Sequence, residues 1–269
     1  MKIYMMTDLE GVSGVVDWEV CDQDTHENHA RRQLMRRLLT GEVNAAIEGL
    51  FAGGATEVVV NDGHGTGYTL DFEMIDPRVT VIHGTHRPFW LPELDESFAA
   101  TVLIGAHARA GTPGGVLYHT QSTLVKRTTV NHLEIGEIGQ QALIAGHYGV
   151  PMVLVTGDQA ACAEAEALVP GIETVAVKRG LSRYAAVSLP PARARERIRE
   201  GAQRALGRIA EIKPLRLAPP YVWRDELFHQ AYEPGVEVAG DAVVHDRNVR
   251  EFRADNIIDL VNKAFGYPR

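Results

Sequence analysis

Two carboxylates near the amino terminus are the first residues whose types and spacing indicate chemistry. The apolar residues 3–6 are typical of a buried strand, and Asp8, Glu10 and Gly11 follow them. Side chains alternate along an extended chain, so Asp8 and Glu10 are expected on the same side. Two carboxylates on one face, beside permissive glycines, suit a hard or borderline cation. For this stretch alone, an equally good interpretation is that Asp8 caps a turn and Glu10 is solvated.

Histidines follow two later apolar strands in the same way. His64 follows a strand predicted at residues 56–60, and His107 follows one predicted at residues 100–104. A single histidine after a strand is more often structural than functional. In a parallel α/β sheet, however, functional side chains gather beyond the carboxyl ends of the strands. Three strands that each deliver a carboxylate or an imidazole to one edge therefore predict a metal centre.

The donor types indicate which metal this centre would hold and how many ions. Imidazole together with carboxylate favours zinc over magnesium or calcium, and it leaves manganese, cobalt and iron open. Asp8, Glu10 and His64 would saturate one metal together with a water molecule. A second metal bridged by Asp8 would give His107 a reason to be there. Glu137, which has small neighbours in Gly-Glu-Ile-Gly, is the best further ligand, although a solvated helical glutamate is the default interpretation.

His119 has three interpretations, because it lies between a glycine- and proline-rich segment and the next predicted strand. It could be a metal ligand, a catalytic acid-base or a surface residue. The remaining histidines with no comparable setting are interpreted as structural or surface residues: His26, His29, His132, His147, His229 and His245.

The elements that must position these residues alternate between strands and helices. Helices are predicted at residues 30–51, 134–148, 190–212 and 255–265, with another that begins at about 159. Further strands are predicted at residues 79–83, 124–130, 152–155 and 174–177. This alternation predicts an α/β fold with a mostly parallel sheet flanked by helices.

Toward the carboxyl terminus the long apolar strands and amphipathic helices of the sequence give way to shorter patterns. From Pro214 onward there are short strand-like pieces, such as residues 237–239 and 242–244, which predict a smaller mixed α+β C-terminal region. The one candidate boundary lies at residues 188–191. We therefore predict a catalytic, metal-binding domain at residues 1–189. We also predict that residues 190–269 pack on this domain and take part in oligomerisation.

Composition limits the classes of partner. The formal net charge of -8 provides no basic footprint, so no nucleic-acid partner is expected. No apolar run approaches membrane-spanning length, and the first residues do not resemble a signal peptide. The two cysteines, Cys21 and Cys162, lack metal-type spacing, which argues against a thiolate site and is typical of a reducing cytoplasm.

Several separated blocks of the sequence resemble, in order, the motif series of the bacterial D-aminopeptidases of the dipeptide transport operon. The resemblance covers roughly the first 185 residues well and the remainder faintly. The blocks that carry it are Asp8-Leu9-Glu10-Gly11, Asn61-Asp62-Gly63-His64, Gly105-Ala106-His107-Ala108-Arg109, His119, Gly136-Glu137, Gly157-Asp158, Val177-Lys178 and Ser182-Arg183.

The resemblance implies a binuclear zinc peptidase that removes D-amino acids from the amino terminus of short peptides. It implies that Asp8 bridges the two zinc ions, that Glu10 and His64 complete one site, and that His107 and Glu137 complete the other. His119 matches the catalytic histidine of the family. The resemblance also implies a ring-shaped homo-oligomer, a decamer of stacked pentamers.

One departure from the family pattern affects His119. The segment Pro113-Gly114-Gly115-Val116 holds one glycine more than that pattern, and extra glycine increases the conformational entropy lost on ordering. We therefore predict that His119 reaches the site when substrate or a neighbouring subunit orders this segment.

Two other function classes compete with a peptidase. An aspartyl-nucleophile phosphatase has an Asp after its first strand and another two residues later, and it uses a later acidic motif similar to Gly157-Asp158. Here the second position is Glu10, no second acid stands at Cys162, and that chemistry does not require His64 or His107. A non-catalytic peptide-binding accessory of a transporter is the other alternative, and the lack of a recognisable secretion signal argues against a periplasmic binder.

Overall fold

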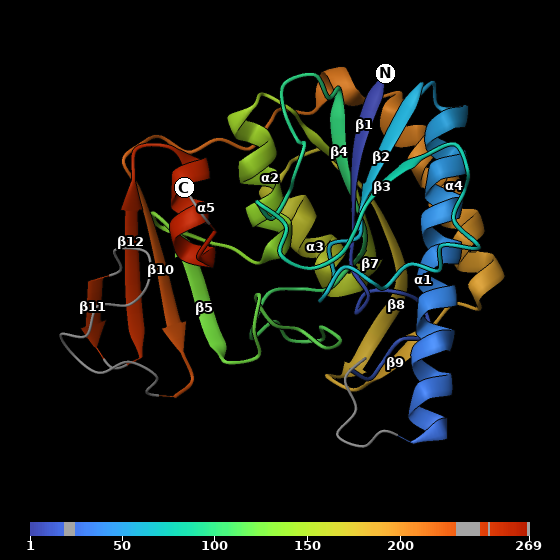
Figure 1. Cartoon of the computed structure of the whole chain (residues 1–269), viewed down its shortest axis with the longest axis horizontal. Helices are drawn as coiled ribbons and strands as arrows, with labels where there is room; N and C mark the ends of the chain where they lie inside the picture. Colours follow the sequence, from blue (N-terminus) through green and yellow to red (C-terminus); the bar gives the residue numbers. More distant parts are fainter. Residues whose placement is uncertain (19–24, 230–242, 247, 268–269) are drawn as a thin grey trace.

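The structure is a computed structural model, and it describes residues 1–18, 25–229, 243–246 and 248–267. Two sheets organise the chain (Figure 1). The larger is seven-stranded with the order β3-β2-β1-β4-β7-β8-β9, and the smaller is five-stranded with the order β11-β12-β10-β5-β6. The predicted class, a mostly parallel sheet flanked by helices with a smaller C-terminal region, is confirmed.

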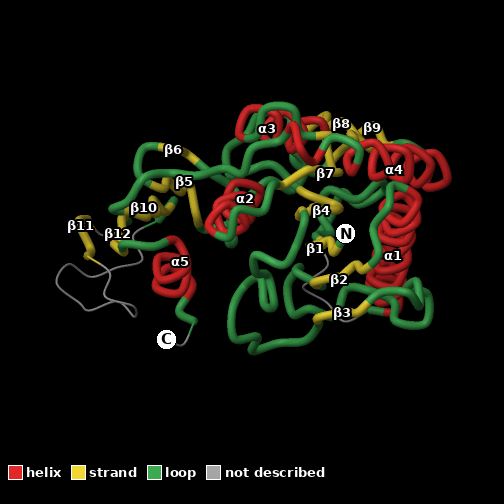
Figure 2. The backbone as a smooth tube through the Cα atoms, turned by 90° about the horizontal axis from the view of Figure 1, so that it is seen from above, coloured by secondary structure: helices red, strands yellow, loops and turns green. Residues whose placement is uncertain are grey.

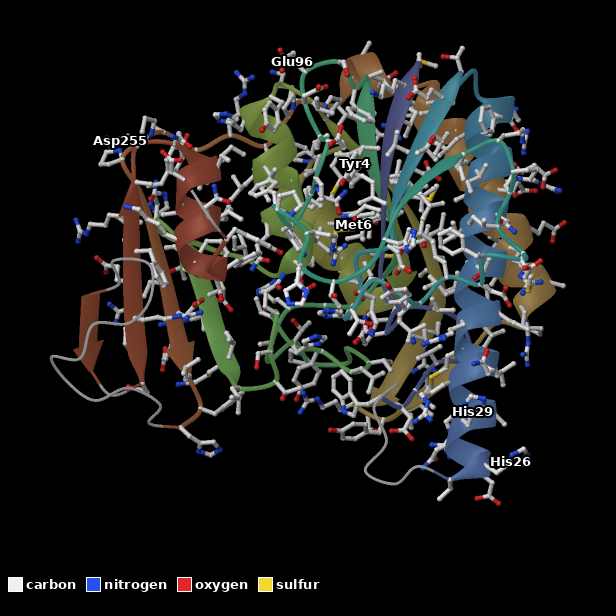
Figure 3. All side chains as sticks on the ribbon, in the orientation of Figure 1. Tyr4, Met6, His26, His29, Glu96 and Asp255 are labelled. Atoms are coloured by element: carbon white, nitrogen blue, oxygen red, sulfur yellow. The ribbon has the colours of Figure 1, made fainter. Side chains whose placement is uncertain are left out.

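The larger sheet is parallel except at one edge. Its strands are β1 (Lys2–Thr7), β2 (Glu57–Asn61), β3 (Thr80–Ile82), β4 (Ala100–Ala106), β7 (Met152–Asp158), β8 (Glu173–Ser182) and the antiparallel β9 (Ala185–Ser188). The central strands are buried on both faces, as expected for a parallel sheet covered by helices. Tyr4 and Met6 on β1 both point into this core (Figure 3).

Helices cover both faces of the larger sheet (Figure 2). On one face lie α1 (His26–Ala52) and α4 (Pro191–Leu206), and on the other lie α2 (Glu137–His147) and α3 (Gln159–Leu168). Helices α1 and α4 approach closely at Gly49, where an added Cβ would lie 2.1 Å from the carbonyl oxygen of Arg199. The glycine thus allows two backbones to meet over the sheet.

The smaller sheet is antiparallel and draws on two distant parts of the chain. Its strands are β5 (Val125–Val130), β6 (Leu133–Glu134), β10 (Tyr221–Leu227), β11 (Val243–Asp246) and β12 (Val249–Ala254). Helix α5 (Ile257–Phe265) contacts β10, β12 and α2, so it connects this sheet to the larger unit. Phe265 of α5 makes edge-to-face contacts with Trp90 and Trp223.

Element boundaries differ from the sequence predictions for local reasons. Helix α1 begins four residues earlier than predicted, because the Thr25 side chain accepts a hydrogen bond from the backbone N–H of Asn28 and caps it. Helix α2 begins at Glu137 and not at residue 134, because Leu133 and Glu134 pair with β5. Helix α4 ends at Leu206, and a separate 3-10 turn, Ile209–Glu211, follows it.

The two sheets do not separate at a single point in the chain. Helix α4, which we predicted to lie in the C-terminal region, contacts α1, β7 and β8 of the larger unit. Strands β5 and β6, which we predicted to lie in the first domain, belong to the smaller sheet. The division at residues 189 and 190 and its role in oligomerisation stay predictions. The strand-like piece at residues 237–239 lies outside the described residues.

Candidate metal centre

The candidate site lies at the carboxyl ends of three neighbouring strands. Strand β1 lies between β2 and β4. The chain first extends the sheet on one side of β1, with β2 and β3, and then on the other side, with β4, β7, β8 and β9. Such a switch in strand order is where α/β sheets bind ligands. Asp8 directly follows β1, His107 directly follows β4, and His64 stands three residues beyond the end of β2. The sheet thus brings the three predicted strand ends together.

One group of potential ligands consists of Asp8, Glu10 and His64, whose ligand atoms lie within 4.8 Å of one another. The Nδ1 atom of His64 lies 2.9 Å from Asp8 Oδ1 and 3.0 Å from Glu10 Oε2. The alternation argument for this pair does not hold, because β1 ends at Thr7 and the chain then turns. The turn nevertheless directs both carboxylates toward the same imidazole.

A second group consists of His107, His119 and Glu137, again with ligand atoms within 4.8 Å of one another. The Nε2 atom of His107 lies 3.2 Å from Glu137 Oε1, whereas Nε2 of His119 lies 3.8 Å from the same oxygen. The rings of His107 and His119 are stacked, with centroids 4.0 Å apart. Glu137 is the first residue of α2, where the positive end of the helix dipole favours a carboxylate.

Asp8 connects the two groups. Its Oδ1 faces His64, and its Oδ2 lies 3.4 Å from Nε2 of His107. Glu10 Oε2 and His107 Nε2 are buried, and within the described part of the chain no group meets either atom in hydrogen-bond geometry, although His64 Nδ1 lies 3.0 Å from the first and Glu137 Oε1 lies 3.2 Å from the second. Buried polar atoms are rarely left without a partner, so this pair of atoms fits a cation at each group. Three carboxylates and two or three imidazoles are a donor set suited to zinc.

The charges of this cluster depend on one another. Burial opposes ionisation of Asp8, but His107 and His64 outweigh burial and hold the pKa of Asp8 well below its usual range. Burial also opposes protonation of His107, yet Glu137 and Asp8 raise the pKa of His107 well above its ordinary value. The buried carboxylates thus favour positive charge at this position, which imidazolium protons or a divalent metal can supply.

Backbone carbonyls fix the ring orientation of the two stacked histidines. Nδ1 of His107 donates to the carbonyl of Ala108 at 2.9 Å, and Nδ1 of His119 donates to that of Leu117 at 3.0 Å. A carbonyl can only accept, so each Nδ1 carries the proton and each Nε2 is left to face the site. Such partners are the usual support for histidines that bind metals or move protons.

The turn that carries His64 is held by Asp62 and Arg87. The Asp62 carboxylate accepts from the backbone N–H groups of Thr69 at 2.8 Å and Leu70 at 3.1 Å. The Arg87 guanidinium donates to the Asp62 carbonyl and to the side chain of Asn61, each at 2.8 Å. The glycine-rich run after β2 is therefore an organised turn that presents a histidine.

The segment that carries His119 is also anchored, in contrast to the flexibility predicted from its glycines. The backbone N–H of Val116 donates to Asp158 Oδ2 at 2.7 Å, and that of Leu117 donates to the Arg183 carbonyl at 2.8 Å. The ring of Trp18 meets the His119 ring edge-to-face at 5.3 Å. His119 consequently reaches the site within the single chain.

Asp158 itself has a structural role. Besides receiving the Val116 N–H, it caps α3 by accepting from the backbone N–H of Ala161 at 2.8 Å. Both oxygens thus accept backbone hydrogen bonds, and neither candidate ligand group among the described residues includes Asp158.

Sequence reasoning missed Gln121, a residue that orients a predicted ligand. Its backbone N–H donates to Glu137 Oε1 at 2.8 Å, and its side chain donates to Gln140 Oε1 at 2.9 Å. Gln121 has a φ of 59°, which is uncommon for a residue other than glycine. No local pattern indicates it, because the contact depends on how the loop before β5 meets the start of α2.

Gly11 allows the loop after β1 to cross β4. Its N–H donates to the Gly105 carbonyl at 2.7 Å, and an added Cβ would lie 2.0 Å from the Ala106 carbonyl oxygen. We expect Gly11→Ala to lower stability by about 1–3 kcal/mol, as overpacking does, and to weaken metal binding by displacing Asp8 and Glu10. Thermal unfolding and metal titration measure both effects.

Gly207→Ala is the matched control, because its Cβ would meet its nearest neighbour, the Arg204 carbonyl oxygen, at an ordinary 3.4 Å. A Gly11→Ala protein as stable as Gly207→Ala would contradict the close crossing.

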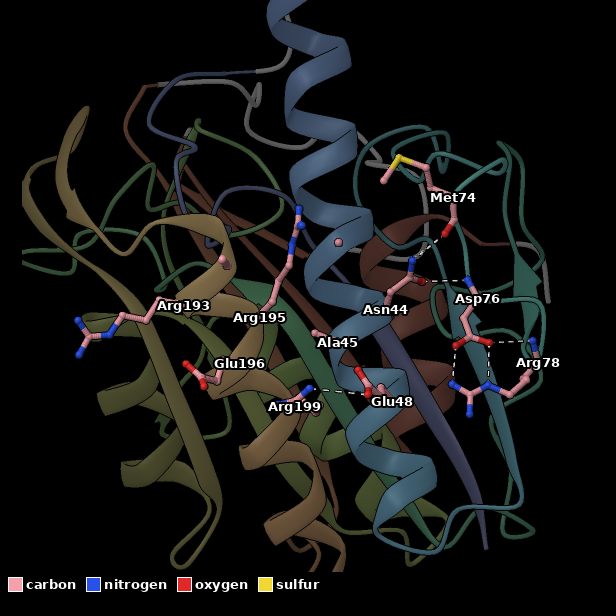
Figure 4. Close-up of a pocket in the computed structure, with 12 residues that line it drawn as sticks. Asn44, Ala45, Glu48, Met74, Asp76, Arg78, Arg193, Arg195, Glu196 and Arg199 are labelled. Atoms are coloured by element: carbon pink, nitrogen blue, oxygen red, sulfur yellow. Dashed lines mark hydrogen bonds and ion pairs between the residues drawn. The ribbon is translucent and has the colours of Figure 1, made fainter.

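A broad groove between α1, α4 and residues 74–78 lies apart from this centre (Figure 4). Four of its charged side chains form two pairs, with Arg78 2.5 Å from Asp76 and Arg199 3.7 Å from Glu48. None of the described residues that line it is a histidine or a cysteine. His26 and His29 are exposed at the start of α1, also away from the candidate site (Figure 3). We assign no function to either feature.

Comparisons with known proteins show which family the chain belongs to. The family model for peptidase M55, D-aminopeptidase, matches residues 1–263. A D-aminopeptidase of Bacillus subtilis (strain 168) is 39% identical over 221 residues, which cover 82% of this chain and 78% of the relative. The match to the family model extends well beyond the first 185 residues, to which the resemblance was strongest.

A solved structure is similar over almost the whole chain. It is the Zn-dependent D-aminopeptidase DppA from Bacillus subtilis, a self-compartmentalizing protease, with a TM-score of 0.87 and 32% identity. The similarity covers 99% of this chain and 96% of that one. Among the described residues, no helix is both long and apolar enough to cross a membrane. The chain belongs to the peptidase M55 family of D-aminopeptidases.

Proposed function

We propose that this chain is a zinc-dependent aminopeptidase that removes N-terminal D-amino acids from short peptides or amides with two metals in one site. The observation that carries the proposal is the position of Asp8, whose two oxygens face different histidines. Family membership and the zinc dependence of the structural relative support it.

The ligands follow from the two groups. Asp8, Glu10 and His64 would hold one zinc, and Asp8, His107 and Glu137 would hold the other. His119 is the weaker candidate ligand, because its Nε2 is farther from Glu137 Oε1 than that of His107 and is 3.8 Å away. Zinc, when bound, acts as a Lewis acid that makes water more acidic and polarises the scissile carbonyl.

His119 is proposed as the proton carrier of the reaction. Because Nδ1 donates to the Leu117 carbonyl, Nε2 of the neutral ring is an acceptor that faces the site. It can take a proton from the attacking water and then deliver that proton to the leaving amine. Stacking on His107 and contact with Trp18 hold the ring in this position during both transfers.

Assembly and location extend the proposal. The relative with the similar fold is self-compartmentalizing, which supports a homo-oligomer for this chain too. A decamer of stacked pentamers and a cytoplasmic location remain expectations from the resemblance and from cysteine usage.

The test combines metal content with stereochemical preference. We expect about two zinc equivalents per chain by elemental analysis, and faster hydrolysis of D-alanyl than of L-alanyl amides or peptides. Chelation should abolish both activities, because water activation and carbonyl polarisation are lost together. A preference for L-substrates would leave the zinc chemistry standing and reject the D-specificity, whereas a fully active metal-free protein would reject the proposed mechanism.

A further inference from the structure

Lys178, on β8, is the one lysine that is buried among the described residues, with 3% of its surface exposed. It belongs to the Val177-Lys178 block of the sequence, and neither proposed ligand group includes it. Its Nζ donates to three backbone carbonyls of the loop after β1: those of Glu10, Val12 at 3.0 Å and Val15 at 2.5 Å. All three acceptors lie in the loop that carries the proposed ligands Asp8 and Glu10.

The number of acceptors matches the chemistry of an ammonium group. A protonated lysine has three N–H donors and no acceptor, so three converging carbonyls satisfy it completely. The same contacts satisfy carbonyls of an irregular loop that a sheet or helix would otherwise have to pair. A buried group with all its hydrogen bonds made at one loop constrains that loop strongly.

Two buried acidic side chains, Asp158 and Glu42, act on Lys178 electrostatically and oppose the effect of burial, which lowers the pKa of Lys178. Asp158 is its register partner on β7, and Glu42 of α1 accepts from the N–H of Ser13 in the same loop at 2.9 Å. Asp158 also holds the segment that carries His119 through the Val116 N–H. Lys178 therefore contacts the loop that carries Asp8 and Glu10, and it pairs in register with Asp158, which holds the segment that carries His119.

We propose that Lys178 is a positioning residue, whose ammonium group holds the loop after β1 so that the Asp8 and Glu10 carboxylates are arranged for metal before metal binds. This assignment rests on the proposed function. Residues that orient metal ligands typically contribute ten- to hundred-fold to metal affinity. The side chain itself touches neither substrate nor the predicted ligand atoms.

The experiment measures zinc affinity by competition with a chromophoric chelator for wild type, Lys178→Met and Lys178→Gln. Met has similar length and no donor, whereas Gln keeps two donors. We expect roughly ten- to hundred-fold weaker zinc binding for Lys178→Met and an intermediate loss for Lys178→Gln. Lys263→Met is the matched control, because Lys263 is a surface lysine that also donates to a carbonyl, that of Arg253 at 2.8 Å.

Melting temperatures with zinc and with a chelator separate positioning from general stability. Positioning predicts that zinc raises the melting temperature of Lys178→Met much less than that of wild type. If both lysine variants bind zinc as tightly as wild type, and their melting temperatures fall equally with and without zinc, the assignment is overturned. Should Lys178→Met not fold, Lys178→Gln alone decides by the same criteria. A wild type that binds no zinc overturns the proposed function and this assignment with it.

Discussion

Asp8→Ala is expected to release both zinc ions and to lower kcat/KM on the order of 10⁴-fold or more. The reason is geometric, because Asp8 is, among the residues that the structure describes, the one whose oxygens face both His64 and His107. Water activation and stabilisation of the developing oxyanion would then be lost together. Elemental analysis of the variant and initial rates on a D-alanyl amide measure the two effects.

The control for Asp8→Ala is Asp95→Ala. Asp95 is exposed, and its hydrogen bonds are made to Ser97 two residues away. It should keep full zinc content and full rate. Glu10→Ala adds a sharper comparison, since Glu10 belongs to one group and should cost one zinc equivalent. Retention of one zinc in Asp8→Ala would contradict the bridging position.

The strand ends were the most predictable part of the site. Parallel strands that are buried on both faces read as continuous apolar runs, so the residue at which polarity returns marks the carboxyl end. Asp8 and His107 stand at that position. The rule that such ends share one edge of the sheet then predicts their proximity without any knowledge of strand order.

Glu137 and His119 depended on packing that has no local signature. Glu137 reaches the site because α2 starts at that residue. The start of α2 can come this close to Arg109 because Gly136 has no side chain, and an added Cβ there would lie 2.6 Å from Arg109 Cβ. The segment that carries His119 is held by partners distant in sequence, because Asp158 accepts from the Val116 N–H and Arg183 donates to the Tyr118 carbonyl. The sequence offered Glu137 as a ligand only through its small neighbours and left three interpretations of His119 open, and the resemblance to a known family then gave each residue one role.

The smaller sheet shows why sequence composition alone could not indicate which strands share a sheet. Thr128 of β5 donates a hydrogen bond to Asp225 of β10, 97 residues away. A short strand with one exposed face has the same local pattern whichever sheet it joins, and nothing in residues 124–130 indicates the partner. Helix α4 presents the complementary case, because its apolar stripe shows that it covers a sheet without showing which sheet it covers.

His119→Ala tests the division of roles within the second group, where geometry alone permits two arrangements. His107 and His119 stack on each other and both approach Glu137 Oε1, so either ring is close enough to take part in metal binding. The His119 side chain is 13% exposed, whereas that of His107 is 1% exposed and also contacts Asp8. The more accessible ring is the better placed to exchange a proton with substrate.

We therefore expect His119→Ala to keep two zinc equivalents and to lose about 10²- to 10⁴-fold in kcat, the usual contribution of a positioned acid-base. His107→Ala should instead lose zinc and rate together, because it removes a ligand. The two variants share the same substitution and neighbouring, stacked positions, so differences in folding are matched as closely as the chain allows. If His119→Ala sheds zinc, then His119 is a ligand, and the proton must be carried by another group. If it keeps its zinc and most of its rate, His119 has a structural role. Its ring then packs against His107 and Trp18, and the hydrogen bond from its Nδ1 to the Leu117 carbonyl holds the segment in place without taking part in the reaction.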